Sequence, residues 1–189
     1  MKWPLLFPVY TIEKYRLAPI ETERSKDIFA LYSDPEICRY LQRDPMQKES
    51  EAFMQIERWQ RDFRSKRGLR WGIFEGNSFE ASLMGTVALH YVNEEHQRAE
   101  LGADLFPVHW GKGIITLLTG RLIEIAFSEI GLHRLELRCM PDNIPSVRIA
   151  LKSGFTYEGT LRDYVFIQGK GFTSERVYSL LSTEYGVGE

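Results

Sequence analysis

A glycine-flanked loop leading into a long amphipathic helix constrains the fold of this chain more than any other feature. The segment from Arg98 to Thr116 contains a strand-like stretch, a short turn and then the sequence WGKGII. Gly111 and Gly113 have no Cβ, so the backbone there can turn tightly and leave successive N–H groups facing an anion. The helix that follows adds a partial positive charge at its N-terminus. The segment therefore predicts a binding site for a phosphorylated ligand.

Two other kinds of glycine loop do not fit this segment. A nucleotide triphosphatase loop needs GxxxxGK followed by Ser or Thr, but Lys112 is followed by Gly113 and Ile114, so no hydroxyl is available for magnesium. A dinucleotide-binding loop needs GxGxxG, and Thr116 occupies the position of the third glycine. The pattern therefore favours neither of these two nucleotide-binding folds.

Length and charge limit the organisation of the chain and its partners. With 189 residues, of which 43% are hydrophobic, we expect one domain over residues 1–189, with a core over about 15–181. Lys and Arg number 24 against 26 Asp and Glu, so no broad basic surface is available for nucleic acid or anionic membrane. The expected partners are small molecules or peptide ends, and the expected assembly is a monomer or homodimer.

Cysteine and histidine usage indicates a reducing compartment and no metal. Cys38 and Cys139 lie far apart without metal-ligand spacing, and the four histidines form no HxxxH or HExxH pattern. The four histidines are expected in turns or in packing. The apolar stretch at the start is interrupted by Pro4 and Pro8 and is too short for a signal peptide or a membrane span. We therefore expect a cytoplasmic protein with no metal.

Hydrophobic periodicity predicts alternating strands and helices. Apolar residues recur at helical spacing in the stretches 22–33, 35–41, 49–67, 113–130 and 144–153. Strand patterns occupy 15–20, 69–75, 83–91, 98–106, 134–140, 155–161 and 173–181. The three consecutive strands from 69 to 106 are expected to form an antiparallel meander, and the helix over 113–130 to cross over and pack on the sheet. These patterns favour an α+β fold.

Six segments, occurring in order over about 15–181, together resemble one family. They are YRLAPIE, DPEICRYL, LMGTVALHYV, RAELGADLFPVHWGKGIIT, MPDNIPSVRIALKSGFTYEG and LRDYVFIQGKG. This combination resembles the GNAT acetyltransferases, specifically their RimJ/RimL-like branch of ribosomal-protein N-terminal acetyltransferases. The resemblance implies a mixed, mostly antiparallel central sheet with a V-shaped split and helices on both faces. It also implies that acetyl-CoA, the co-substrate, lies in that split with its pyrophosphate on the loop before the long helix.

The resemblance assigns the cofactor contacts to particular residues. They are Leu105, Trp110, Gly111, Lys112, Gly113, Ile114, Ile115 and Asn143. Trp110 replaces the polar first residue of the family's loop, and Ile115 replaces a small residue, although its N–H can still donate. Asn143 and Ser146 match an NxxS element that would lie near the pantetheine and the thioester sulfur. Arg148 and Lys152 either contact the CoA phosphates or lie on the outer face of their helix.

The chemistry of amine acetylation indicates the catalytic candidates. An amine must lose its proton before it can attack a thioester, and Glu100, on the strand that lines the split, is the expected base, against the alternative of a surface carboxylate paired with Arg98. A backbone N–H near residues 103–105 is expected to stabilise the acetyl oxygen. The departing thiolate needs a hydrogen bond or a proton, for which Ser146 is the first candidate, with Tyr164 or water as alternatives. Cys139 is expected to be inert packing, so direct transfer is favoured over a covalent intermediate.

The acceptor is the least constrained part of the prediction. The resemblance implies a primary amine, first of all the N-terminal amine of a protein, with ribosomal proteins as the family's best-known targets. The alternatives are a small-molecule amine, such as an antibiotic, a polyamine or an amino-acid derivative, and a non-catalytic CoA-binding module. Trp59, Phe63 and Trp71 are expected to pack in the core rather than line an acceptor pocket.

Overall fold

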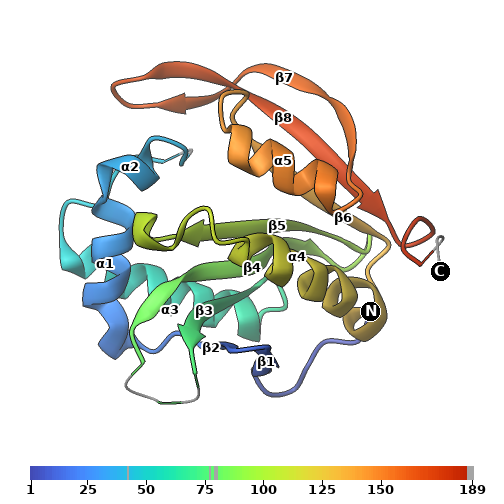
Figure 1. Cartoon of the computed structure of the whole chain (residues 1–189), viewed down its shortest axis with the longest axis horizontal. Helices are drawn as coiled ribbons and strands as arrows, with labels where there is room; N and C mark the ends of the chain where they lie inside the picture. The colour runs from blue at the N-terminus through green and yellow to red at the C-terminus, as the bar shows by residue number, and fades with distance from the viewer. Residues whose placement is uncertain (42, 77, 79–80, 187–189) are drawn as a thin grey trace.

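In the computed structural model, which describes residues 1–41, 43–76, 78 and 81–186, the chain forms one eight-stranded sheet with helices on both faces (Figure 1). The strands are β1 (Tyr10–Ile12), β2 (Tyr15–Pro19), β3 (Leu69–Glu75), β4 (Leu83–Asn93), β5 (Arg98–Leu105), β6 (Arg134–Cys139), β7 (Thr156–Ile167) and β8 (Gly171–Leu181). Their order in the sheet is β1-β2-β3-β4-β5-β6-β8-β7, and the β5–β6 pair is parallel while the other pairs are antiparallel. The predicted mixed, mostly antiparallel sheet is confirmed.

The helices divide between the two faces of the sheet. They are α1 (Ser25–Ser33), preceded by the 3-10 turn η1 (Thr22–Arg24), α2 (Pro35–Cys38), α3 (Glu49–Arg64), α4 (Ile114–Glu124), which continues as the π-helical turn Ile125–Ile130, and α5 (Ile144–Lys152). A further 3-10 turn, η2 (Pro107–His109), precedes α4. No helix in the described part of the chain is long and apolar enough to cross a membrane.

Strand alternation produces two hydrophobic clusters, one on each face. Odd-numbered residues of the central strands, such as Trp71 and Leu101, are buried with Leu118 of α4. Even-numbered Phe74 is buried with Ile28 of α1 and Ile56 of α3 on the other face. Each fully buried side chain of this size contributes about 1.5–3 kcal/mol, so the register of the strands is strongly specified. Glu100 has an even number and therefore lies on the face of α1 and α3.

The sheet splits in its middle. β5 and β6 pair only from Arg98 opposite Arg134 to Glu100 opposite Glu136. Beyond this point β5 continues along β4, and β6 continues along β8 from Leu137 onward. The two central strands therefore diverge directly after Glu100, and the expected V-shaped split is present.

Several element boundaries differ from the predictions. β1 was not predicted, because three residues are too few to show alternation. α3 ends at Arg64 rather than at 67. Lys66 takes a left-handed φ of 58°, so the helix does not continue through this residue. The second helix ends at Cys38 rather than at 41, and the β7–β8 hairpin extends six residues beyond the predicted end at 161. Local patterns located the elements, whereas long-range pairing determined their ends.

Candidate active site

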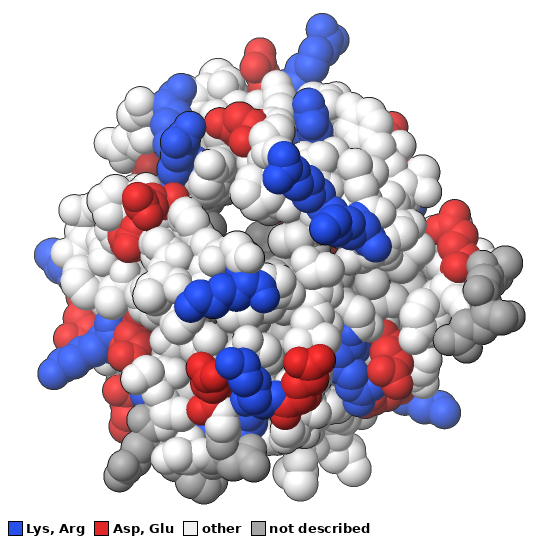
Figure 2. Space-filling view, viewed as in Figure 1, with Lys and Arg blue, Asp and Glu red and all other residues white. Residues whose placement is uncertain are grey.

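One continuous cavity of about 1580 Å³ connects the two faces of the sheet through the split. Its lining includes Gly111 and Ser146 at one end, Glu100 at the split, and Tyr32 and Trp59 at the other end. Figure 2 shows the molecule hollowed near the centre of this view, with Lys and Arg side chains around the opening. We refer to the end at the glycine loop as the cofactor end and to the end beneath α1 and α3 as the acceptor end.

The glycine loop has the geometry of an anion site. Gly111 and Gly113 take φ values of 72° and 74°, a left-handed conformation that a residue with a Cβ adopts only under strain. No side chain caps the start of α4 among the described residues, and the first helical hydrogen bond runs from Leu117 N–H to Gly113 O (3.0 Å). The N–H groups of Ile114 and Ile115 therefore have no partner within the helix, and they form the positive end of its dipole. The backbone of this loop fits a pyrophosphate.

Two side chains of the loop, Trp110 and Ile115, make contacts within the protein. The Trp110 indole Nε1 donates a hydrogen bond to the carbonyl oxygen of Leu105 (2.8 Å), which fastens the loop to the end of β5. Ile115 is half-buried and packs against the main core, so its bulk is directed at least partly into the protein. Lys112 lines the cavity as an exposed cation. The departures from the family pattern at Trp110 and Ile115 therefore leave the backbone donors in place.

Backbone groups of β5 point into the split. Phe106 N–H donates to the carbonyl oxygen of Met84 on β4 (3.0 Å), and in an antiparallel pair hydrogen-bonded positions alternate with positions that face outward. Leu105 lies opposite Gly85 and is therefore at an outward-facing position, as is Ala103 two residues earlier. Since β6 has already left β5 here, the N–H groups of Ala103 and Leu105 face the opening.

The start of α5 gives different roles to Asn143 and Ser146. The Asn143 side-chain oxygen accepts a hydrogen bond from Ser146 N–H (3.2 Å), so Asn143 is the N-cap of the helix. Ser146 is therefore not the cap, and it lines the cavity, as do Arg148 and Lys152. Tyr164, the alternative to Ser146, lies on β7, is 55% exposed and is not among the described residues that line the cavity.

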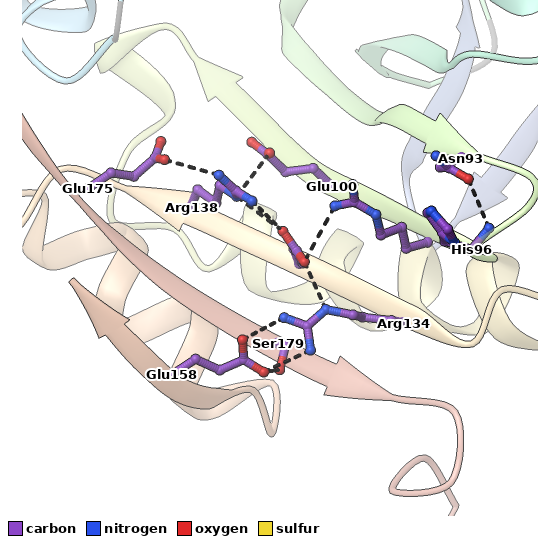
Figure 3. Close-up of polar contacts among 10 residues, drawn as sticks. Asn93, His96, Glu100, Arg134, Arg138, Glu158, Glu175 and Ser179 are labelled. Carbon is purple, nitrogen blue, oxygen red and sulfur yellow. Dashed lines mark hydrogen bonds and ion pairs between the residues drawn. The ribbon is translucent and has the colours of Figure 1, made fainter. Parts of the chain in front are cut away.

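Glu100 lies at the apex of the split, where both ends of the cavity meet. Its side chain is 19% exposed, and Figure 3 shows it pointing from β5 towards Arg138 of β6. The Arg138 Nε atom lies 3.6 Å from Glu100 Oε2, and His90 Nε2 lies 3.7 Å from Oε1. The side chain is therefore held between two neighbours, away from bulk water.

Burial raises the pKa of Glu100 to about 7, and the nearby Glu175 and Glu136 add to the rise. The Arg138 guanidinium opposes this effect but does not cancel it. Burial together with Arg70 lowers the pKa of His90 to about 3, so this imidazole is neutral near pH 7 and its contact with Glu100 is not an ion pair. A carboxyl group that titrates near neutrality is suited to accepting a proton.

Arg138 is held in place by a network of buried carboxylates. It contacts Glu136 Oε2 through Nη2 (2.8 Å) and Glu175 Oε2 through Nη1 (3.4 Å). Arg134 joins the same network through Glu136 (2.8 Å) and Glu158 (2.6 Å), as Figure 3 shows for the labelled members. Because Glu136 and Glu175 bind Arg138 more directly than Glu100 does, the guanidinium only partly compensates the charge of Glu100.

The acceptor end contains a second polar cluster. Arg70 Nη1 donates to Thr86 Oγ1 (2.7 Å) and to the Tyr32 hydroxyl (3.1 Å), and lies 3.4 Å from Asp104 Oδ2. The Tyr32 hydroxyl donates to the same Asp104 oxygen (2.8 Å). Burial raises the pKa of Tyr32, so its proton stays in place near pH 7. The Arg70 guanidinium also lies over the Trp59 ring, 4.9 Å from its centroid.

Sequence reasoning missed most of this acceptor end. Trp71 is buried as expected, but Trp59 lines the cavity. His90, one of the histidines expected in turns or in packing, packs on β4 beside Glu100. The missed residues share one pattern, since they occupy even-numbered positions of three consecutive strands, on the face that carries Glu100: Arg70, Thr86, His90 and Asp104. Strand alternation alone would have placed them on one face of the predicted meander, without showing which of them lie opposite one another.

Comparison with known proteins agrees with this geometry. Residues 14–156 match the acetyltransferase (GNAT) domain family. The uncharacterized N-acetyltransferase YoaA of Bacillus subtilis is 32% identical over 176 residues, which cover 93% of this chain and 98% of YoaA. The putative ribosomal N-acetyltransferase YdaF of the same organism is 31% identical over 130 residues, 69% of this chain and 68% of YdaF. The solved structure of the spermidine N-acetyltransferase from Vibrio cholerae in complex with CoA and spermine covers 91% of this chain and 98% of its own at a TM-score of 0.78 and 24% identity, a likeness of fold.

Proposed function

This chain belongs to the GNAT acetyltransferase family and is an N-acetyltransferase, and we propose that it acetylates the N-terminal α-amine of a protein or peptide by direct transfer from acetyl-CoA. The observation that carries the proposal is Glu100, a buried carboxyl group at the apex of the split that both ends of the cavity reach. The resemblance of the sequence to ribosomal-protein acetyltransferases and the name of YdaF support the same acceptor.

The pKa of Glu100 favours an α-amine over an alkylamine. An α-ammonium group has a pKa of about 8, whereas a lysine-like ammonium has a pKa of about 10.4. With a pKa of about 7, Glu100 is about one pH unit weaker as a base than an α-amine, but more than three units weaker than an alkylamine. Proton transfer to Glu100 is therefore much less unfavourable from an α-ammonium group than from an alkylammonium group.

The residues of the split have distinct roles in this proposal. Bound acetyl-CoA supplies the acetyl group as an activated thioester. Glu100 accepts the proton that the amine loses as its nitrogen bonds to the carbonyl carbon, and later releases this proton to water. The N–H groups of Ala103 and Leu105 donate hydrogen bonds to the acetyl oxygen while it carries negative charge. Ser146 donates a hydrogen bond to the sulfur as the carbon–sulfur bond breaks, and the thiolate is then protonated from solvent.

Direct transfer is supported by the state of Cys139. This residue lines the cavity, but burial raises the pKa of its thiol to about 11. A thiol that remains protonated near pH 7 is a poor nucleophile, so a covalent acetyl-cysteine step is disfavoured. The amine is therefore proposed to attack the thioester itself.

The proposal is tested by measuring the release of free CoA thiol with a matched panel of acceptors. The panel contains a peptide with a free N-terminal alanine, the same peptide with a blocked N-terminus and an internal lysine, and spermidine. We expect turnover with the free N-terminus, a mass gain of one acetyl group at that amine, and loss of turnover in the Glu100→Gln variant. Turnover confined to the lysine peptide or to spermidine would overturn the α-amine assignment.

A further inference from the structure

We propose that Arg43 and Arg70 form an anion-binding subsite at the acceptor end, so that the preferred acceptor carries a carboxylate close to its amine. This inference rests on the proposed function, because it concerns the acceptor of the same reaction. It goes beyond that function by naming the chemistry that selects among N-terminal amines, namely an acidic side chain near the N-terminus.

Arg43 is a cation with no carboxylate partner of its own. Its guanidinium lies over the Tyr32 ring, 5.0 Å from the centroid, and Nη1 lies 3.5 Å from the side-chain oxygen of Gln55. Within the described residues, no carboxylate lies at ion-pair distance from Arg43. The side chain is half-buried and lines the cavity. Its charge is therefore available to a ligand.

Tyr32 brings the two arginines together. Arg43 lies over the face of its ring, and Arg70 donates to its hydroxyl group (3.1 Å). Asp104 is the carboxylate of this cluster, 3.4 Å from Arg70. The cluster around Tyr32 thus contains two guanidinium groups and one carboxylate, and the Arg70 side chain is only 13% exposed. An excess positive charge in such a partly dehydrated site attracts an anion more strongly than it would at the surface.

The rest of the cavity lining has the same charge bias. At the acceptor end the cavity is lined by five arginines, Arg43, Arg58, Arg61, Arg67 and Arg70, and by three aspartates, Asp44, Asp62 and Asp104. Asp104 is paired with Arg70, and Asp62 is shared between Arg58 and Arg67. A polycation such as spermidine would find few free carboxylates here. This lining therefore favours an acidic acceptor, although the fold is shared with a spermidine N-acetyltransferase.

Spacing along β5 sets how far the carboxylate lies from the amine. Glu100 and Gly102 are neighbours on one face of the strand, about 7 Å apart. A Cβ at Gly102 would lie 2.9 Å from His90 Nε2 and 3.8 Å from Arg70 Nη2, so the glycine keeps the path between Glu100 and Arg70 open. Arg70 lies level with Gly102, two strands away across β4, so an acceptor must extend from Glu100 past this glycine to reach it. An N-terminal amine followed by an acidic second residue can extend in this way. The α-carboxylate of a free amino acid lies closer to its own amine.

The test compares peptides that differ only at their second residue. Three peptides begin with alanine followed by Asp, Asn or Lys, and free glutamate and spermidine are measured beside them by release of CoA thiol. We expect kcat/KM for the Asp peptide to exceed that for the Asn peptide by about tenfold, chiefly through KM, because the Asp carboxylate forms a charge-assisted hydrogen bond that the Asn amide cannot form. The Lys peptide and spermidine should be poorer still.

The variants assign the preference to the subsite. Arg43→Gln should remove most of the Asp-over-Asn preference, because it should raise KM for the Asp peptide more than KM for the Asn peptide. Arg64→Gln, an exposed arginine of α3 outside the cavity, is the matched control and should keep the preference. A Lys peptide or spermidine used as well as the Asp peptide, or an equal loss for all peptides in Arg43→Gln, would overturn the subsite alone. A preference for free glutamate would show that the carboxylate belongs to a small molecule and would overturn the peptide assignment. Absence of turnover with every amine would overturn the proposed function.

Discussion

The two ends of the cavity differ in the groups that line them: backbone at the cofactor end and side chains at the acceptor end. The cofactor end consists mainly of backbone, with two left-handed glycines and the uncapped start of α4 presenting N–H groups. The acceptor end consists of polar and aromatic side chains from three strands and two helices, with the largely buried Glu100 and Arg70 at its base. Backbone donors are insensitive to most side-chain changes, whereas a network of buried charges responds to each one. Most side-chain substitutions should therefore have a small effect at the cofactor end, unless they change the glycines of the loop, and a large effect at the acceptor end.

The largest effect is expected from Gly113→Asp at the cofactor end. This change places a Cβ at a φ of 74° and a negative charge where the pyrophosphate is proposed to bind. In the wild type, CoA and acetyl-CoA should raise the Tm, with much smaller shifts for NAD and ATP, because a ligand bound to the native state stabilises it. The variant should show no CoA-induced shift in a thermal melt.

Gly120→Ala is the matched control for this variant. Gly120 lies inside α4, and a Cβ there would meet nothing within 4 Å. It should retain the full CoA-induced shift. Equal shifts for all four ligands in the wild type, or an unchanged CoA shift in Gly113→Asp, would contradict the assignment of the cofactor end.

At the acceptor end, Glu100→Gln should reduce kcat by about 10² or more while leaving the affinity for acetyl-CoA nearly unchanged. The amide keeps the shape of the side chain but cannot take the proton from the amine. Raising the pH should recover part of the loss, since more acceptor is then unprotonated in solution. A variant that also loses CoA binding would show that Glu100 has a structural role.

The same contrast explains what could be predicted from the sequence. The glycine loop and Glu100 lie within one short stretch whose local pattern predicts an anion site and a base. The role of Ser146 was predicted from the family resemblance, and the fold from periodicity together with that resemblance. The acceptor end depends on which residues of β3, β4 and β5 lie opposite one another, and on Tyr32 and Trp59 from separate helices. Local periodicity specifies no register between strands, so it does not bring His90 beside Glu100. It also does not show that Trp59 of α3 lines the cavity.

Glu100→Gln should also change stability with a defined sign. The pKa of Glu100 is raised from 4.5 to about 7 in the folded protein, so the folded state binds the proton more tightly than the unfolded state does. The stability gained from the protonated form is complete below pH 4.5 and is lost as the pH rises to about 7. Above that pH the buried carboxylate destabilises the protein by about 3 kcal/mol, an order-of-magnitude value.

The glutamine variant removes this destabilisation, because it carries no charge at any pH. In urea titrations it should therefore unfold at higher denaturant than the wild type at pH 8, and the difference should shrink towards pH 4.5. A variant less stable than the wild type at pH 8 would mean that the carboxylate stabilises the fold through Arg138.

A smaller effect is expected from Ser146→Ala, which removes the proposed hydrogen bond to the leaving sulfur. Hydrogen bonds to charged groups contribute about 1.5–3 kcal/mol, so kcat should fall by about tenfold with the CoA-induced Tm shift preserved. Ser153→Ala, at the other end of α5 and outside the cavity lining, is the control and should leave kcat unchanged. Normal kcat in Ser146→Ala would transfer this role to water.

The central claim is that Glu100 is the base, and the pH dependence of kcat/KM tests it most directly. The acceptor should be a weakly basic amine, such as an α-amino nitrile, that is unprotonated across the whole pH range, so that the acceptor itself contributes no titration. With this acceptor the wild type should still show kcat/KM rising to a plateau through a pKa of about 7. In Glu100→Gln the profile should be low and flat. A rise near pH 7 that persists in Glu100→Gln would contradict the account, because another group would then be accepting the proton.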